Sequence, residues 1–393
     1  MTALNVLKLA DIASINPKLT SRPADDELIS FVPMSAVDAQ TGATGSGEER
    51  SFGEVSKGYT VFSDQDVLVA KITPCFENGK IAQAGLTHRM GVGSTEFHVI
   101  RPNRSQLDVR YLLHFLRRPA VRAAGERRMT GSAGQRRVPE AFLAALAIPV
   151  PPLPEQKRIA EVLDRVGELR TKRQQALACV DGLTQSIFVD MFGNPHRLHR
   201  TWKAMPLEAV CTAINDCPHS TPRWTESGEI CLRTSNLTKG GWDWTDTRFV
   251  SPATFVERSK RGSIEPGDIV LSREGTVGIA AIVEEGMRIC MGQRLVQVRP
   301  QIDLLTPKFL LTYLLNVLAP ERIASFMVGS TSRHLNVREL KALRVPLPPV
   351  RLQQQFAARA QEVDRLRGAQ QRQLVELDGL FASLQDRAFR GLL

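Results

Sequence analysis

Two long stretches of the chain lack proline and carry apolar residues at the spacing of coiled-coil helices. They run from Glu155 to Met191 and from Leu352 to Ala388, and each follows a proline-rich junction. We expect two helices, each roughly 55 Å long because a helix rises about 1.5 Å per residue. The apolar seam positions are Ile159, Leu163, Val166, Leu177, Val180, Ile187 and Met191 in the first stretch and Phe356, Ala360, Val363, Leu374, Leu377, Phe381, Leu384 and Ala388 in the second.

Polar residues interrupt both seams near the middle of the expected helices. Arg170 and Arg173 stand in the first seam, and Arg367 and Gln370 stand in the second. In an antiparallel pair the two middles meet, so these residues would form a polar layer that fixes the register at some cost in stability. Alternatively, the arginine stems lie along the apolar surface and their charged ends stay in solvent.

The rest of the chain shows short apolar runs bounded by Gly, Pro, Asn and Asp, which are typical of strands and turns. Examples are Asp66–Ile72, Phe97–Ile100, Asp268–Leu271 and Arg294–Val298. Leu107–Arg118 and Thr306–Leu318 have helical spacing instead. We therefore predict an α+β fold with two domains of mixed β-sheet and short helices. Each domain is followed by a long helix, and the two helices are expected to pack as an antiparallel coiled coil.

The second half of the chain repeats the first at an offset of 197 to 198 residues. Ile148-Pro-Val-Pro-Pro152 returns as Val345-Pro-Leu-Pro-Pro349, and Tyr111-Leu-Leu-His-Phe115 returns as Phe309-Leu-Leu-Thr-Tyr313. Several matches in one order predict a duplicated unit. The predicted boundaries are 1–148 for the first domain, 149–193 for its junction and helix, 194–345 for the second domain and 346–393 for the second junction and helix.

The composition is that of a folded, basic protein. Of 393 residues, 42% are hydrophobic and 23% are charged, which excludes a disordered chain. Lys and Arg number 51 against 41 Asp and Glu, and the net charge of +10 favours an anionic partner such as nucleic acid. The six cysteines are scattered and no apolar run is long enough to cross a membrane, so we expect a cytoplasmic protein.

Motifs for modifying nucleic acid or moving along it are missing. The sequence has no Gly-x-x-x-x-Gly-Lys-[Ser/Thr] loop, which argues against an ATP motor. Cys211, Cys217, His219 and Cys231 are irregularly spaced, and this disfavours a zinc site. We therefore expect no catalytic residue, no bound cofactor and no metal in this chain.

The densest positive stretch runs from Arg117 to Arg137, with seven arginines against one glutamate. Its end, Gly131–Arg137, combines backbone freedom with side chains able to contact phosphates or base edges. The counterpart, Gly329–Asn336, is less charged but equally rich in short hydrogen-bond donors. A solvated basic helix end would explain part of this charge without any ligand.

Three features resemble the specificity subunits of type I restriction-modification systems. Lys57–Phe62 with Asp66–Lys80 looks like a common segment of that family's target recognition domains. Thr130–Val138 with Ile148–Asp164, which contains Pro-Pro-Leu-Pro-Glu-Gln, is similar to the family's junction between domain and helix. The third feature is the duplicated plan. The second junction departs from the first, with Pro349-Val-Arg-Leu-Gln353 in place of Pro152-Leu-Pro-Glu-Gln156.

The resemblance implies a non-catalytic specificity subunit of a multi-subunit adenine methyltransferase and site-specific deoxyribonuclease. Each target recognition domain would read one half of a bipartite sequence in double-stranded DNA, and the helices would act as a spacer. Two methyltransferase subunits would bind S-adenosylmethionine, and motor-nuclease subunits would use ATP and magnesium. These cofactors would belong to the partners rather than to this chain.

The side chains that we expect to contact DNA lie in loops of both domains. They are Lys71, Thr73, Asn78, Lys80, Gln135, Arg136 and Arg137 in the first domain, and Arg233, Ser235, Asn236, Arg273, Arg294, Arg333 and His334 in the second. The alternative for each is an ordinary loop or turn whose polar groups are satisfied within the domain.

Two other functions are compatible with parts of the sequence. A self-sufficient DNA methyltransferase or nuclease would fit a basic protein, but it would need the missing motifs. A coiled-coil scaffold without DNA binding would fit the long helices, but it would leave the basic loops without a role.

Overall fold

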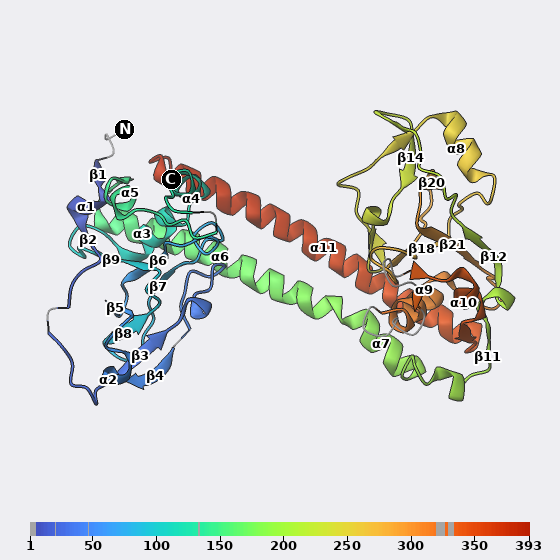
Figure 1. Ribbon diagram of the computed structural model, residues 1–393, viewed down its shortest axis with the longest axis horizontal. Helices are drawn as coiled ribbons and strands as arrows, with labels where there is room; N and C mark the ends of the chain where they lie inside the picture. The colour runs from blue at the N-terminus through green and yellow to red at the C-terminus, as the bar shows by residue number, and fades with distance from the viewer. Residues whose placement is uncertain (1–4, 20, 46, 133, 320–326, 329–333) are drawn as a thin grey trace. The chain divides into compact units, whose positions relative to one another are not determined.

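The structure is a computed structural model that describes residues 5–19, 21–45, 47–132, 134–319, 327–328 and 334–393. Its contacts divide the chain into two compact units. Unit 1 comprises residues 1–177 and 370–393, and unit 2 comprises residues 178–369. Each unit mixes helices with sheets, as the sequence predicts (Figure 1). The domain boundaries proposed from the sequence stay a prediction.

Unit 1 contains two four-stranded sheets and one two-stranded pair. Its strands are β1 (Val6–Lys8), β2 (Ala13–Ile15), β3 (Leu28–Val32), β4 (Glu48–Ser51), β5 (Thr60–Ser63), β6 (Val67–Ala70), β7 (Ile81–Gln83), β8 (Met90–Gly93), β9 (Phe97–Pro102) and β10 (Ala147–Pro149). The antiparallel sheet has the order β2-β9-β6-β7, and the mixed sheet has the order β4-β3-β8-β5 with β3 parallel to β8. Strands β1 and β10 form the separate pair.

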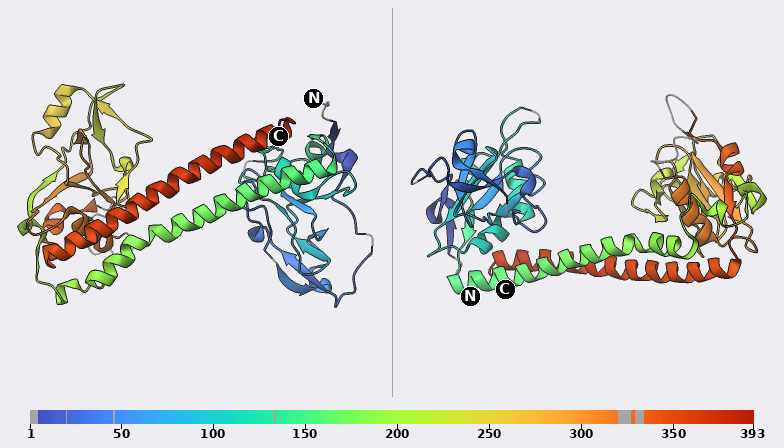
Figure 2. Two further views of the ribbon diagram at one scale, coloured as in Figure 1. Left: turned by 180° about the vertical axis from the view of Figure 1, so that it is seen from behind. Right: turned by 90° about the horizontal axis from the view of Figure 1, so that it is seen from below.

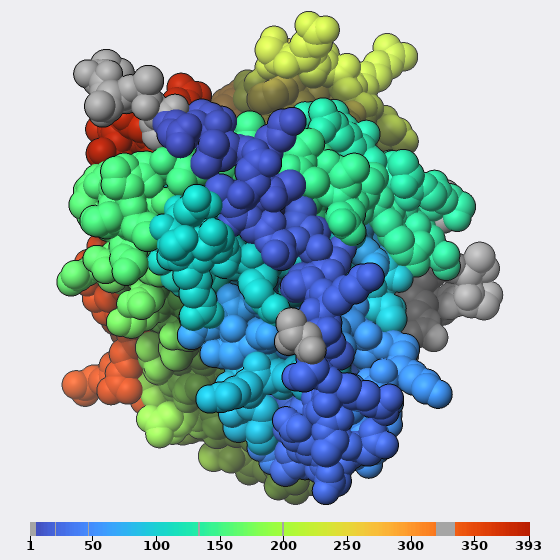
Figure 3. All heavy atoms as spheres, turned by 90° about the vertical axis from the view of Figure 1, so that its left-hand side faces the viewer, coloured from blue at the N-terminus to red at the C-terminus, as the bar shows by residue number. Residues whose placement is uncertain are grey.

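Strand β6 lies at the centre of unit 1 because both of its faces are apolar. Val67 and Val69 pack into the core beside the helices, whereas Leu68 packs against residues of the mixed sheet such as Val32 and Phe62. Successive side chains of a strand point to opposite faces, so a run of four apolar residues can join two layers. Figure 3 shows one face of unit 1 as spheres, with the early, dark-blue part of the chain crossing it.

Unit 2 repeats part of this topology. Its strands are β11 (Ala204–Pro206), β12 (Cys211–Asp216), β13 (Trp224–Thr225), β14 (Glu229–Leu232), β15 (Leu237–Thr238), β16 (Gly241–Trp242), β17 (Phe249–Val250), β18 (Ile269–Ser272), β19 (Ala280–Ile282), β20 (Ile289–Met291), β21 (Leu295–Pro300), β22 (Met327–Val328), β23 (His334–Leu335) and β24 (Arg344–Pro346). The order β12-β21-β18-β19 matches that of β2-β9-β6-β7, and β14 and β20 are parallel like β3 and β8. The mixed sheet differs, because its order in unit 2 is β13-β17-β14-β20, so the duplication extends to the antiparallel sheet and to the parallel pair.

Short helices cover the antiparallel sheet of each unit. The helices of the chain are α1 (Leu9–Ile12), α2 (Phe52–Val55), α3 (Val109–Leu116), α4 (Pro119–Glu126), α5 (Glu140–Ala144), α6 (Leu153–Asp181), α7 (Leu183–Phe192), α8 (Pro252–Ser259), α9 (Pro307–Val317), α10 (Val337–Ala342) and α11 (Val350–Phe389). The expected helices at Leu107–Arg118 and Thr306–Leu318 are confirmed as α3 and α9. Asp108 and Thr306 cap them by accepting hydrogen bonds from the first free N–H groups. None of the described helices is long and apolar enough to span a membrane.

The first long helix differs from its expected form. It is divided at Gly182 into α6 and α7, whereas α11 runs unbroken through the equivalent Gly379. Glycine weakens a helix because it has more backbone freedom to lose than other residues. Since Gly379 leaves α11 intact, glycine alone does not account for the break.

Each unit completes its core with segments that are distant in the sequence. In unit 1, Ile159 and Leu163 at the beginning of α6 share a core with Ala388 and Phe389 at the end of α11. The Phe389 ring lies 4.9 Å from the Tyr111 ring of α3, between centroids. Figure 2 shows these ends of α6 and α11, green and red, beside the sheets of unit 1.

Unit 2 has the reciprocal composition. The beginning of α11 contributes Phe356, and α7 contributes Phe188 and Phe192. Phe188 packs against Phe309 of α9 and against Phe356, each with 5.4 Å between ring centroids. The apolar seam residues at these helix ends therefore belong to the cores of the units.

A buried glutamine fixes the junction of each unit to its long helix. The Gln156 side chain donates to the carbonyls of Gln106 and Pro151 and accepts from the N–H of Asp108, each at 2.8 Å. Gln353 makes the same set of bonds, to the carbonyls of Leu304 and Pro348 and from the N–H of Thr306. The two junctions are equivalent in this respect although their sequences differ.

A carboxylate also ties α6 to α3. Asp164 accepts from Arg110 at 3.0 Å through Nε and from His114 at 2.7 Å. Burial alone would raise the pKa of Asp164, but the hydrogen bonds from His114 and Arg110 outweigh it and lower the pKa to about 2. The carboxylate is therefore ionised in the folded protein at neutral pH.

We expect Gln353→Met to lower the free energy of unfolding of unit 2 by about 2 kcal/mol, because it leaves the buried Thr306 N–H and two carbonyls without partners. The four tryptophans all lie in unit 2, so urea unfolding followed by tryptophan fluorescence measures this unit. Gln354→Met is the matched control, since Gln354 is exposed. Equal losses in both variants would contradict the structural role of Gln353.

We expect Asp164→Asn to destabilise unit 1 in a pH-dependent way. The folded pKa is lowered, so the contribution of Asp164 is present above its ordinary value of 3.8 and is lost as the pH falls toward 2. The difference in thermal unfolding midpoint between wild type and variant, measured by circular dichroism, should be large at pH 7 and shrink below pH 4. Glu161→Gln, at an exposed position of α6, should show no such trend.

Candidate nucleic-acid interface

In unit 1, three separate loops meet at the end of strand β6. The N–H of Lys71 donates to the carbonyl of Glu96 at 2.8 Å, and the carbonyl of Lys71 accepts from the N–H of Val138 at 2.8 Å. The N–H of Thr73 donates to the carbonyl of Arg136 at 3.0 Å. These bonds bring together the loops from which Lys71, Thr73 and Gln135 to Arg137 were predicted as DNA contacts.

Part of this predicted set is engaged within the unit. Arg137 donates to both carboxylate oxygens of Glu96, at 2.9 and 2.8 Å, and this pairing lowers the pKa of Glu96. Thr73 donates to Glu77 at 2.6 Å, and the Lys80 ammonium donates to the carbonyl of Met34 at 2.7 Å. These contacts support a role in shaping the loops, although Arg137 keeps free N–H groups.

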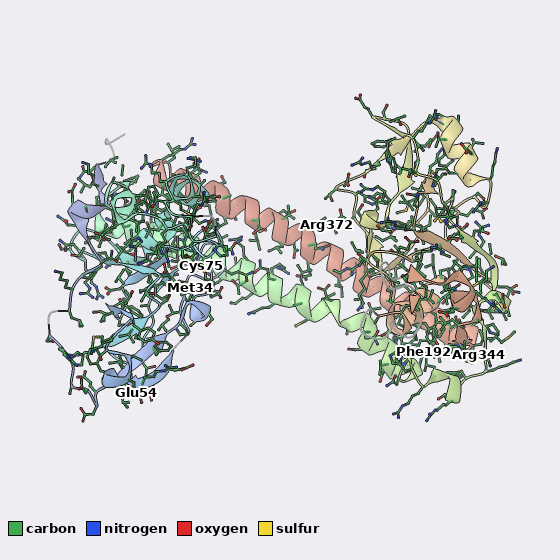
Figure 4. The ribbon with its side chains drawn as sticks, in the orientation of Figure 1. Met34, Glu54, Cys75, Phe192, Arg344 and Arg372 are labelled. Atoms are coloured by element: carbon green, nitrogen blue, oxygen red, sulfur yellow. The ribbon has the colours of Figure 1, made fainter. Side chains whose placement is uncertain are left out.

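Other predicted side chains are available for a ligand. Among the residues that the structure describes, the side chains of Lys71, Asn78, Gln135 and Arg136 have no hydrogen-bond or ion-pair partner. Asn78 lies in the turn that follows Cys75, and Lys80 connects this turn to Met34. Figure 4 labels Cys75 and Met34. Unit 1 therefore presents free cationic and amide groups around the end of β6.

Unit 2 has an equivalent cluster at the end of strand β18. The N–H of Arg273 donates to the carbonyl of Arg294 at 3.0 Å, and the carbonyl of Arg273 accepts from the N–H of Leu335 at 2.8 Å. Arg273 thus occupies the position of Lys71, and Leu335 that of Val138. Two of the side chains predicted in this domain, Arg273 and Arg294, lie together here.

The acidic residues of this cluster determine how available each arginine side chain is for a ligand. Arg273 pairs with Asp216 at 3.1 Å and with Glu274 at 3.3 Å, and its side chain is only 13% exposed. Arg294 pairs with Glu274 at 3.3 Å but is 61% exposed. Its φ of 69° is in the left-handed region, which residues with a side chain rarely adopt and which is enriched at functional sites. Arg294 is therefore the more accessible group.

The remaining predicted residues of unit 2 lie elsewhere. Arg233, Ser235 and Asn236 belong to the short helix η4 (Thr234–Asn236) and its N-cap, which bond to residues 243–246 rather than to the Arg273 cluster. Asn236 is 1% exposed, donates to the carbonyl of Asp243 at 3.0 Å and accepts from the N–H of Arg233 at 2.9 Å. Its amide is satisfied internally, which favours the alternative of an ordinary turn, and its contact with DNA stays a prediction.

The last two predicted residues follow α9 in the sequence. His334 lies in strand β23, which pairs with β22. Arg333 lies outside the described residues.

The loop 217–223 of unit 2 is not among the segments predicted to contact DNA, but the structure places it next to them. The Gln293 amide donates to the carbonyl of His219 at 2.6 Å, so this loop lies beside the segment that carries Arg294. Arg258, only 5% exposed, holds both segments by donating to the carbonyls of Met291 at 2.8 Å and Ser220 at 3.1 Å. The signal in the sequence was Pro218-His-Ser-Thr-Pro-Arg223, a turn rich in donors.

A metal centre is not formed by the residues that the structure describes. None of their His, Cys, Asp and Glu side chains form a group of three or more that could hold a metal ion.

Comparison with known proteins relates most of the chain to one family. The type I restriction modification DNA specificity domain matches twice, over residues 4–178 and 200–377. The specificity subunits of the type I restriction enzymes EcoEI and EcoAI, both from Escherichia coli, are 43% and 41% identical over 183 and 181 residues. Each match covers 46% of this chain but only 31% of the relative, so the chain matches about a third of these proteins. The MjaVIII specificity subunit of Methanocaldococcus jannaschii is 19% identical over 92% of this chain and 86% of its own length.

Two solved structures share the fold. One, from a study of complex assembly and conformational transition in a type I restriction-modification system, covers 100% of this chain and 99% of its own, with a TM-score of 0.63 and 23% identity. The other, the type I restriction-modification S subunit of M. genitalium, covers 99% and 97%, with a TM-score of 0.57 and 14% identity. With two family domains that together span most of its length, the chain belongs to the type I restriction-modification DNA specificity family.

Proposed function

We propose that the chain is the DNA-recognition subunit of a type I restriction-modification complex, and that each unit reads one half of a bipartite sequence. The observation that carries the proposal is the repeated cluster at the ends of β6 and β18, where loops from separate parts of each unit meet around Lys71 and Arg273. Cations and amides in such loops can contact phosphates and base edges. Two different clusters on one framework suit two different half-sites.

The long helices would act as the spacer between the two readers. We propose that α6 and α7 together pack against α11 as an antiparallel coiled coil. In support, Arg170 pairs with Asp378 and Phe188 packs against Phe356. The residue number rises from the first pair to the second on α6 and α7 and falls on α11, as it does in an antiparallel pair of helices. Arg173 also donates to Gln370, which favours the polar layer over arginines that only extend to solvent.

The partners follow from the same proposal. Two methyltransferase subunits would bind S-adenosylmethionine and modify adenine, and motor-nuclease subunits would use ATP and magnesium. This chain would contribute no catalytic group and bind none of these cofactors, and would direct the enzymes to their DNA sites.

The direct test is co-expression of the chain with its methyltransferase subunit, followed by mapping of modified adenines in the host genome. Modification at one bipartite sequence is the expected result. A complex that modifies adenine without any sequence preference would contradict the proposal, and so would methylation by the chain alone.

We expect Arg136→Gln to weaken binding to all duplexes about equally and to lower the slope of log affinity against log salt by about one, because a phosphate contact is lost. Fluorescence anisotropy of the complex on a labelled duplex at several salt concentrations measures both. Arg104→Gln, an exposed arginine after β9, is the matched control. A changed sequence preference would instead identify Arg136 as a base reader, and unchanged binding would remove it from the interface.

We expect seven residues inserted into both long helices to lengthen the unread gap of the target by about three base pairs. Seven residues add ~10 Å of helix and keep the phase of the seam, and one base pair spans about 3.4 Å. The insertions belong between Val166 and Leu177 and between Val363 and Leu374. The same residues inserted at the exposed turn of Glu285 and Gly286 serve as control. An unchanged gap in an active complex would contradict the spacer role.

A further inference from the structure

Unit 1 contains a cavity of about 860 Å³ whose lining includes none of the side chains predicted to contact DNA. Its walls come from the loop after η1 (Met34–Ala36), from α3 and α4, from the middle of α6 and from the end of α11. The charged residues of its lining are Arg110, Arg117, Arg122, Asp164, Glu168, Arg170, Lys172 and Asp378. The volume is in the range of small-molecule sites, which run from about 300 to 1,000 Å³.

Some of these charges neutralise one another. Arg110 pairs with Asp164, and Arg170 pairs with Asp378 at 2.6 Å. Glu168 and Lys172 are exposed on successive turns of α6. The acidic residues of the lining are therefore either paired or at the solvent edge.

Arg117 and Arg122 have no such counter-ion. Arg117 donates only to carbonyls, those of Ala39 at 2.7 Å and Gln40 at 2.5 Å. Arg122 donates to the carbonyl of Glu77 at 3.0 Å, and its Nε is buried with no partner among the described residues. Neither guanidinium forms an ion pair with a described carboxylate, although Asp38 is close enough to Arg117 to act on it electrostatically.

The environment makes the charge of Arg117 costly. Burial, together with repulsion from Arg110, Arg122 and Arg170, lowers the pKa of Arg117 to about 10. A buried cation without a counter-ion destabilises the fold, and an anion that binds it removes that cost. The cluster therefore favours a ligand with negative charge.

Two glycine turns bring the backbone close to these guanidinium groups. Gly42 and Gly79 have φ values of 70° and 73°. A Cβ on Gly42 would lie 2.5 Å from Nη1 of Arg117, and a Cβ on Gly79 would lie 3.0 Å from Nη1 of Arg122. The loops are thus shaped to hold both guanidinium groups at the wall of the cavity.

We propose that this cavity binds a phosphate group between Arg117 and Arg122, carried either by a free nucleotide or by the DNA backbone. Guanidinium matches phosphate because its N–H groups are planar and form two parallel hydrogen bonds. Leu163, Phe381 and Ala382 supply an apolar wall on which the rest of a nucleotide can lie. The inference goes beyond the proposed DNA recognition, because a free nucleotide would satisfy the same groups without any DNA.

The test compares the full chain with Arg117→Gln, Arg122→Gln and the double variant, and uses Arg104→Gln as control. The probes are inorganic pyrophosphate and ADP, titrated by calorimetry, and a labelled duplex, followed by fluorescence anisotropy. We expect the double variant to weaken binding of at least one probe by about tenfold or more, since charge-assisted hydrogen bonds are lost. Arg104→Gln should bind like the wild type.

The two phosphate sources give different results. A free-nucleotide site binds ADP saturably, and the duplex does not displace it. A backbone site binds ADP weakly, the duplex displaces it, and the double variant lowers the salt slope of duplex binding by about two. The proposal is overturned if the double variant binds all three probes as the control does.

A second measurement needs no variant and therefore holds if the substitutions unfold the chain. Phenylglyoxal modifies accessible arginines, and mass spectrometry locates the modified residues. Pyrophosphate, ADP or the duplex should protect Arg117 and Arg122 in the wild-type chain but leave Arg104 reactive. Protection by polyglutamate alone, or by none of the phosphate probes, would overturn the proposal.

Discussion

Both units depend on one buried amide, the side chain of Gln156 in unit 1 and of Gln353 in unit 2. Each joins three segments at once: the first turn of a long helix, the proline-rich junction before it, and the loop that begins α3 or α9. A glutamine amide can do this because it offers an acceptor and two donors without the desolvation cost of a charge. The direction in which each helix leaves its unit is therefore set by hydrogen bonds as well as by apolar packing.

The two units share buried interactions in addition to this glutamine, whereas the side chains of their surface loops differ. Buried Asp66 binds Arg101 in unit 1, and buried Asp268 binds Arg299 in unit 2, in equivalent strands. In the loops that meet at the opposite ends of β6 and β18, Lys71 corresponds to Arg273, and the segment of Glu96 corresponds to that of Arg294. A shared framework with different loop side chains is what two readers of unlike half-sites require.

The helices and strands of this fold are easier to predict from the sequence than the order in which the strands pair. Helical and alternating spacing identifies α3, α9, β6 and β18, because local periodicity reflects which face is buried. The sheet order is not predictable in this way, since β6 lies between β7 and β9, and β3 pairs with β8 across some sixty residues. For the candidate site, loops at strand ends brought Lys71, Arg273 and Arg294 into the predicted set. The internal partners of Asn236 and of Arg117 could not be predicted, because they depend on a turn that the pattern does not specify or lie far away in the sequence.

The segment 370–393 belongs to the core of unit 1, where Ala388 and Phe389 pack beside Tyr111 and Phe115. A ribosome makes this segment only after all of unit 2 has been synthesised. Unit 2, residues 178–369, is continuous in the chain and can close as soon as it emerges. Until then, unit 1 has an exposed apolar surface on α3 and α6. The unit that is synthesised first is therefore the one that completes its core last.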